Sequence, residues 1–242
     1  MSWGQLVVVA IAIGVASVVQ VLAGFGFSLL SMPIMTLAVP VDEAVVVAAM
    51  LGFGSNLWQS WSGRSTLDRR LAARMTAAAA VGMPFGLLAL ERVADEHLRM
   101  ALGVSVLAAT FLLVRRIDLT HVGAGLDVVS GFVSGVLNTS LSTNGPPLVF
   151  ALQARRLSAD VFRSTIAVVF VASNVVGLGL FAVSGTFTRD AAEAAGVAFP
   201  AWLVGTALAW PIRRHVHGER FRRLVVVLLA AAGLLAIVAA VR

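Results

Sequence analysis

The chain has 242 residues, of which 59% are hydrophobic and 12% are charged. An average soluble domain carries roughly 25% charged residues, so this composition excludes an ordinary soluble protein. The chain has no cysteine, which excludes disulfides, thiolate metal sites and cysteine nucleophiles. The formal net charge is +6, and every basic residue is an arginine. We interpret the clustering of these arginines in short loops as a membrane-orientation signal rather than a nucleic-acid surface.

Long uncharged runs predict membrane-spanning helices. The runs cover residues 1–41, 44–63, 75–90, 100–114, 128–154, 164–188 and 224–241. A helix needs about 20 apolar residues to cross a hydrocarbon core of about 30 Å, and each run is of about that length or longer. The first run has neither a basic region before it nor a cleavage site and polar domain after it. We therefore expect it to be retained rather than cleaved as a signal peptide.

The two halves of the chain contain similar segments in the same order. The corresponding pairs are 24–33 with 138–147, 52–56 with 170–174, and 81–99 with 204–222. Three matches in one order indicate a duplication. We therefore predict two repeats, 1–117 and 118–242, within one integral membrane domain.

The charges of equivalent loops predict that the second repeat is inverted. The loop with Arg64, Arg69 and Arg70 is basic, whereas its counterpart around Asp190 and Glu193 carries acidic residues. Arginine excess marks cytoplasmic loops, so these two loops should lie on opposite sides of the membrane, with both termini outside. Such a reversal is typical of inverted-topology repeats in transporters.

The predicted fold is therefore an all-α polytopic membrane protein made of two inverted repeats. Each repeat would contain one broken-helix hairpin and three transmembrane helices, giving eight to ten segments. The hairpins are expected at 5–40 and 123–154, and the three spans of the first repeat at 44–61, 72–90 and 98–114.

The stretch 137–147 is polar in the middle of an apolar run and ends in two prolines. Proline breaks a helix, and non-helical backbone at membrane depth requires protein or a hydrated cavity to satisfy its polar groups. Exposed helix N-termini at such a break favour an anion. The candidate substrate-binding residues here are Asn138, Thr139, Ser140, Ser142, Thr143, Asn144 and Gly145.

The corresponding break in the first half is glycine-rich, with Gly24, Phe25, Gly26 and Ser28 as candidate substrate-binding residues. Glycine lets a ligand or another backbone approach closely. An alternative for both breaks is that the glycines only let helices pack and that the polar residues only cap helix ends.

Four further polar positions are candidates at membrane depth. Asn56 and Asn174 occupy equivalent positions of the two halves and are assigned to the site, although they could simply bridge helices. Gln20 and Gln59 are the other amides at this depth and are left unassigned.

Two charged residues have alternative interpretations. Arg163 could pair with an oxyanion or extend to the inner surface. Asp127 is the only carboxylate of the second hairpin, and is either a proton-coupling acid or an interfacial residue.

Together, the glycine-phenylalanine-glycine break, the Asn-Gly-Pro-Pro break and the Arg-Ser-Thr helix start resemble the sulfite exporter TauE/SafE family. The resemblance extends over essentially the whole chain. It implies an integral inner-membrane transporter for sulfite, sulfonates such as sulfoacetate, or related carboxylate anions. It also implies that the two breaks, 24–28 and 138–147, line the substrate site.

The paired broken helices predict a secondary transporter that works by alternating access. An anion channel and a non-transporting structural subunit remain alternatives. An enzyme is not expected, because a serine nucleophile would need a base and the chain has no lysine and no histidine within a predicted span. We expect a small anion and the lipid bilayer as partners, no nucleic acid and no cofactor or metal. Coupling to a proton or another ion, and homo-oligomerisation, remain open.

Overall fold

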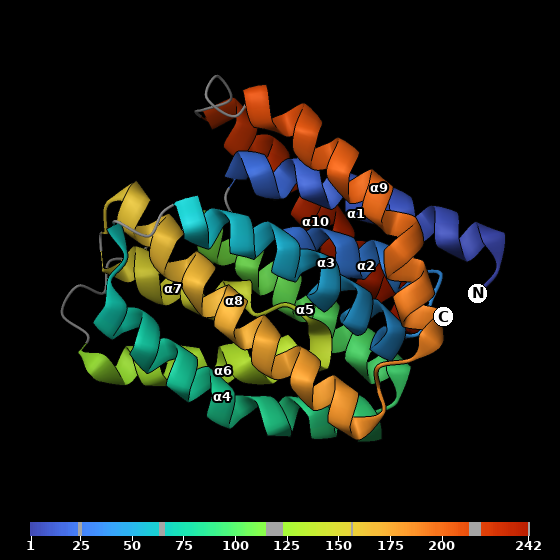
Figure 1. Ribbon diagram of the computed structural model, residues 1–242, viewed down its shortest axis with the longest axis horizontal. Coiled ribbons are helices and arrows are strands. Elements are labelled where there is room, and N and C mark those ends of the chain that lie inside the picture. Colours follow the sequence, from blue (N-terminus) through green and yellow to red (C-terminus); the bar gives the residue numbers. More distant parts are fainter. Residues whose placement is uncertain (24–25, 63–65, 115–122, 156, 213–218, 242) are drawn as a thin grey trace.

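The computed structural model describes residues 1–242 except 24–25, 63–65, 115–122, 156, 213–218 and 242. The described residues form helices only, bundled side by side (Figure 1). The first half contains α1 (Trp3–Ala23), α2 (Phe27–Met35), α3 (Val41–Ser62), α4 (Arg69–Arg92) and α5 (Asp95–Val114). The second half contains α6 (Ala124–Leu141), α7 (Gly145–Ala154), α8 (Ala159–Ser184), α9 (Arg189–Ile212) and α10 (Glu219–Val241). Each half has the predicted pattern of one hairpin followed by three longer helices, which confirms the all-helical class.

Four of the described helices are long enough and apolar enough to cross a membrane. They are Trp3–Leu22, Arg69–Arg92, Asp160–Ser184 and Arg189–Pro211. Large apolar side chains also lie exposed on the outside of the bundle, among them Val81 and Phe85 on α4 and Val204 and Leu208 on α9. A soluble monomer rarely exposes such continuous apolar surface, whereas lipid tails solvate it.

The helices pair in the same way in both halves. Helix α1 packs along α9, and the corresponding α6 packs along α4. Helix α3 of the first half packs on its counterpart α8, and α5 packs on its counterpart α10. This reciprocal pairing is what two repeats related by an approximate two-fold axis produce.

One end of the bundle contains the carboxylates of Asp95 and Asp190, and we call it the acidic end. The α-amino group of Met1 lies 3.6 Å from the Asp190 carboxylate at the start of α9. The Val41 N–H donates to the Asp95 carboxylate at 3.3 Å, joining the starts of α3 and α5. The amide of Gln5 near the start of α1 donates to the carbonyl of Ala38, just after α2, at 2.8 Å. The first hairpin therefore begins and ends at the acidic end.

The second hairpin begins and ends at the opposite end, which we call the arginine end. There Asp127, in the first turn of α6, contacts both Arg74 of α4 and Arg155, just after α7. The Asp68 N–H before α4 donates to the Thr165 hydroxyl of α8 at 3.3 Å at the same end. The two hairpins thus enter the bundle from opposite ends (Figure 1).

The helix breaks are shorter than the polar stretches of the sequence. Helix α2 begins at Phe27 and continues through Pro33, and α6 continues through Leu141. Only Ser142, Thr143 and Asn144 separate α6 from α7. Residues 138–141, predicted within the second break, are therefore the last turn of α6.

Candidate functional site

Both hairpins turn through a left-handed backbone conformation. Gly26, directly before α2, has a φ of 97°, which glycine adopts without a Cβ clash. Ser142, directly after α6, has a φ of 52°, which is uncommon for a residue with a side chain. The Thr143 N–H donates to the Leu137 carbonyl at 3.1 Å and closes the end of α6. The Ser134 hydroxyl donates to the Asn144 carbonyl at 2.9 Å and fixes the returning chain.

A cavity lies where the two breaks meet. It contains about 400 Å³ of space free of atoms, including its opening to solvent. Its walls come from both hairpins and from α3 and α8, so each half contributes the same kinds of element. The lining residues are Gln20, Gly26, Phe27, Ser28, Leu29, Gly52, Asn56, Ser142, Thr143, Asn144, Gly145, Phe170 and Asn174.

The cavity combines helix N-termini with neutral polar side chains. Phe27, Ser28 and Leu29 are the first turn of α2, and Gly145 begins α7. The first N–H groups of a helix have no partner within it, and the helix dipole adds about half a positive charge at this end. Pro146 and Pro147 lack an N–H, so Gly145 is the donor that α7 offers in its first three positions. None of the described residues that line the cavity is ionisable.

Two buried polar atoms of the cavity-lining residues have no hydrogen-bond partner among the described residues. Gln20, only 2% exposed, donates through Nε2 to Asn56 Oδ1 at 3.0 Å, and its Oε1 is left without a donor. The Thr143 hydroxyl, in a residue that is 1% exposed, is also unpartnered. A buried polar group without a partner costs free energy, so both atoms favour a bound polar ligand or water.

The structure gathers eight of the predicted site residues around this cavity. They are Gly26, Ser28, Asn56, Ser142, Thr143, Asn144, Gly145 and Asn174. Arg163 instead lies exposed in the second turn of α8 and does not line the cavity. Gly24 and Phe25 lie outside the described residues.

Three predicted site residues are engaged in helix contacts instead. The Thr139 hydroxyl donates to the Met83 carbonyl of α4 at 2.6 Å. The Ser140 hydroxyl donates to the Val136 carbonyl of its own helix at 2.7 Å, and the Asn138 amide donates to the Ser173 carbonyl of α8 at 3.3 Å. None of the three lines the cavity. The assignment of Asn138, Thr139 and Ser140 to the substrate site therefore has no support from the geometry.

Sequence reasoning left five cavity-lining residues unassigned. Phe27, Leu29, Gly52 and Phe170 carry no polar side chain, so nothing in their chemistry marked them. Gln20 had a usable signal, because it is an amide in the middle of the uncharged run 1–41, away from both of its ends. Its contact with Asn56 across α1 and α3 joins it to a residue that was assigned.

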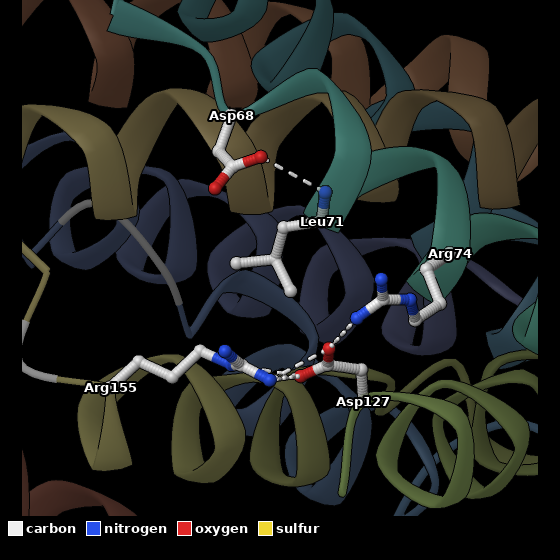
Figure 2. Close-up of polar contacts among 5 residues, drawn as sticks. All are labelled: Asp68, Leu71, Arg74, Asp127 and Arg155. Carbon is white, nitrogen blue, oxygen red and sulfur yellow. Dashed lines mark hydrogen bonds and ion pairs between the residues drawn. The ribbon is translucent and has the colours of Figure 1, made fainter. Parts of the chain in front are cut away.

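A separate charge cluster lies at the arginine end. Figure 2 shows the guanidinium groups of Arg74 and Arg155 converging on the Asp127 carboxylate, at 2.7 Å each. Asp127 is fully buried, and Arg155 also donates through Nε at 2.9 Å. Asp68 caps α4 nearby by accepting from the Leu71 N–H at 3.0 Å. The cluster ties the start of α6 to α4 and to the end of α7, and Asp127 is not among the cavity-lining residues.

Comparison with known proteins identifies the family. The family model described as sulfite exporter TauE/SafE matches residues 9–236. The chain belongs to the sulfite exporter TauE/SafE family. The cavity-lining residues and all of the helices from α2 to α9 lie inside the matched range, as do most of α1 and α10. TauE/SafE is a family of membrane transporters rather than an enzyme class.

A curated relative is similar to about half of this TauE/SafE chain. It is the probable inner membrane transporter protein TsaS of Comamonas testosteroni, 31% identical over 115 residues. The matched region is 47% of this chain and 45% of TsaS, so the chain matches less than half the length of that relative. No solved structure matches the chain.

Proposed function

We propose that this chain is a secondary transporter that carries a small sulfur-containing anion across the inner membrane by alternating access. The observation that supports it is the cavity in which the breaks of both hairpins meet. Two helix N-termini, hydroxyls and amides there present positive potential and hydrogen bonds without a fixed charge. Such a site binds an oxyanion and also releases it, because the described lining residues include no guanidinium or ammonium that would hold it tightly.

The arrangement of the hairpins supports alternating access. Each half supplies one hairpin, and the two enter from opposite ends and meet at the cavity. In transporters with inverted repeats, a site between two such halves is opened to either side by rocking one half against the other. The family name and the TsaS similarity support a sulfur-containing substrate and the inner membrane.

Uptake into proteoliposomes tests the proposal. Labelled sulfite uptake should saturate with concentration and be accelerated by unlabelled sulfite inside the vesicles, since a carrier exchanges substrate. Uptake that rises linearly with concentration, with no acceleration by internal sulfite, would indicate a channel. Absence of uptake and of binding for sulfite and sulfoacetate alike would reject the proposed substrate class.

A substitution in the cavity locates the site. Asn174→Leu removes one amide from the cavity wall and keeps the number and branching of the side-chain heavy atoms. We expect sulfite uptake at low concentration to fall about tenfold, the value of one lost hydrogen bond to a charged group. Ser60→Ala is the control, because that hydroxyl donates to the Leu57 carbonyl of its own helix and does not line the cavity. Equal sulfite uptake by both variants would show that Asn174 does not contribute to the substrate site.

A further inference from the structure

The positive potential in the cavity is matched to one negative charge. The N-termini of α2 and α7 each contribute about half a unit charge, which sums to about one. The described lining adds no ionisable group. A dianion would therefore leave about one negative charge uncompensated in a site of low dielectric, where charge is expensive to bury. A monoanion is neutralised.

One of the cavity-lining residues also carries an unpaired hydrogen-bond acceptor, which an ordinary oxyanion cannot satisfy. Gln20 Oε1 is buried and has no donor among the described residues. Reversing the Gln20 and Asn56 amides together would exchange which residue offers the free oxygen, but one amide oxygen would still be left over. Sulfite dianion and simple sulfonates have acceptor oxygens only. Their oxygens would be repelled by this atom.

We infer that the transported species is a monoanion with its own hydrogen-bond donor, such as hydrogen sulfite, so that one proton crosses the membrane on each anion. This inference rests on the transport function proposed above and specifies its substrate. The donor on the anion satisfies Gln20 Oε1, while its oxygens accept from the helix N-termini and the Thr143 hydroxyl. Proton movement then requires no titrating side chain in the cavity.

The carboxylate that would otherwise be the proton carrier is engaged elsewhere. Both Asp127 oxygens accept from guanidinium groups, with Arg74 at 2.7 Å and Arg155 at 2.8 and 2.9 Å. Arg74 and Arg155 hold it at the arginine end, and it does not line the cavity. A proton bound to the substrate is consistent with this arrangement, because the described residues that line the cavity include an unpaired acceptor, Gln20 Oε1, and no acid.

The test measures sulfite uptake at equal pH on both sides of proteoliposomes, from about pH 6 to about pH 9, with a pH-sensitive dye trapped inside. Above the ionisation of hydrogen sulfite, its fraction falls about tenfold per pH unit. We expect the initial rate of sulfite uptake, after subtraction of the rate in protein-free vesicles, to fall about tenfold per pH unit. We also expect the trapped dye to report acidification of the interior as the anion enters. Uptake that rises with pH, or stays constant, would overturn the inference while leaving sulfite transport established. Absence of sulfite uptake at every pH would also overturn the inference, and the proposed transport function would be rejected only if sulfoacetate uptake were absent as well.

Methanesulfonate is the control anion, because it is a monoanion of similar size with no donor and no ionisation in this range. We expect it to be carried at least about tenfold more slowly than hydrogen sulfite, with no pH dependence. A parallel loss of methanesulfonate uptake with rising pH would show that the protein titrates, not the substrate, and would also overturn the inference.

A variant separates the role of Gln20 from its packing. Gln20→Met keeps the length of the side chain and removes the acceptor, so we expect the preference for hydrogen sulfite over methanesulfonate to fall about tenfold. Gln59→Met, on α3 outside the cavity, should keep the preference of the unsubstituted protein. An unchanged preference in a folded Gln20→Met protein would exclude Gln20 as the partner of the substrate donor. The pH series on the unsubstituted protein decides the inference even if this variant does not fold.

Discussion

Ser142 combines backbone strain with a position in the cavity wall. It has a left-handed backbone at the end of α6, a conformation that costs a residue with a Cβ roughly 1 kcal/mol, and its side chain lines the cavity. We expect Ser142→Gly to raise the thermal stability of the purified protein in detergent while lowering sulfite uptake. Ser142→Ala is the matched variant, because it removes the same hydroxyl and keeps the strain. Uptake should fall equally in both variants, and stability should rise only in the glycine variant. Full uptake by both would show that the hydroxyl has no part in binding.

Residue chemistry predicted the site only in part. Ser142, Thr143 and Asn144 were found because polar residues beside prolines in an apolar run mark a break. Thr139 and Ser140 have the same chemistry, but α6 continues for one turn beyond the start of the polar stretch and directs their hydroxyls to backbone carbonyls. Composition alone cannot distinguish a hydroxyl in the last helical turn from one in the break. The apolar wall residues Phe27 and Phe170 could not be found at all, because their role depends only on position.

The contact between α4 and α6 depends on glycine. A Cβ built on Gly135 of α6 would overlap the backbone of Ala79, and one built on Gly82 of α4 would overlap the Phe132 carbonyl. We therefore expect Gly135→Ala to destabilise the protein by about 2 kcal/mol or more, since backbone cannot move aside as a side chain can. Gly125→Ala on the same helix is the control, because its Cβ would meet nothing within 4 Å and alanine favours helix. Melting curves in detergent measure both, and equal melting temperatures would contradict the close approach.

The ends of the helices were predicted well where charged residues flank an uncharged run. Helices α4 and α5 begin and end within a few residues of the predicted spans 72–90 and 98–114, since arginine and acidic residues mark where chain leaves the membrane. The pairing of these elements was not predictable from the runs. It depends on small residues such as Gly82 and Gly205, which let α4 approach α6 and α9 approach α1.

At the scale of the whole molecule, the duplication predicted from the sequence is consistent with the reciprocal pairing of the helices. Asn56 and Asn174, matched between the halves, line the same cavity from α3 and α8. The charged residues in the described ion pairs also differ between the two ends of the bundle. The acidic end includes Asp95 and Asp190, and the arginine end includes Arg74 and Arg155. From the positive-inside rule we predict that the arginine end faces the cytoplasm.

The inverted topology of the two repeats predicts that equivalent helices begin on opposite sides of the membrane. Arg70 lies in the first turn of α4 and Arg189 begins α9, its counterpart in the second half, and both side chains are exposed. We expect single cysteines in their place to react on opposite sides of the membrane. A membrane-impermeant maleimide added to intact cells should label Arg189→Cys at once and Arg70→Cys only after permeabilisation.

The absence of cysteine from the sequence removes background labelling, and permeabilised cells control for reactivity of each site. Labelling of both variants in intact cells, or of neither, would place equivalent helix starts on one side and contradict an inverted repeat. Labelling of Arg70→Cys alone would keep the inversion and reverse the orientation, because the arginine end would then face outward against the charge rule. The two-variant experiment therefore tests the symmetry and the orientation of the transporter separately.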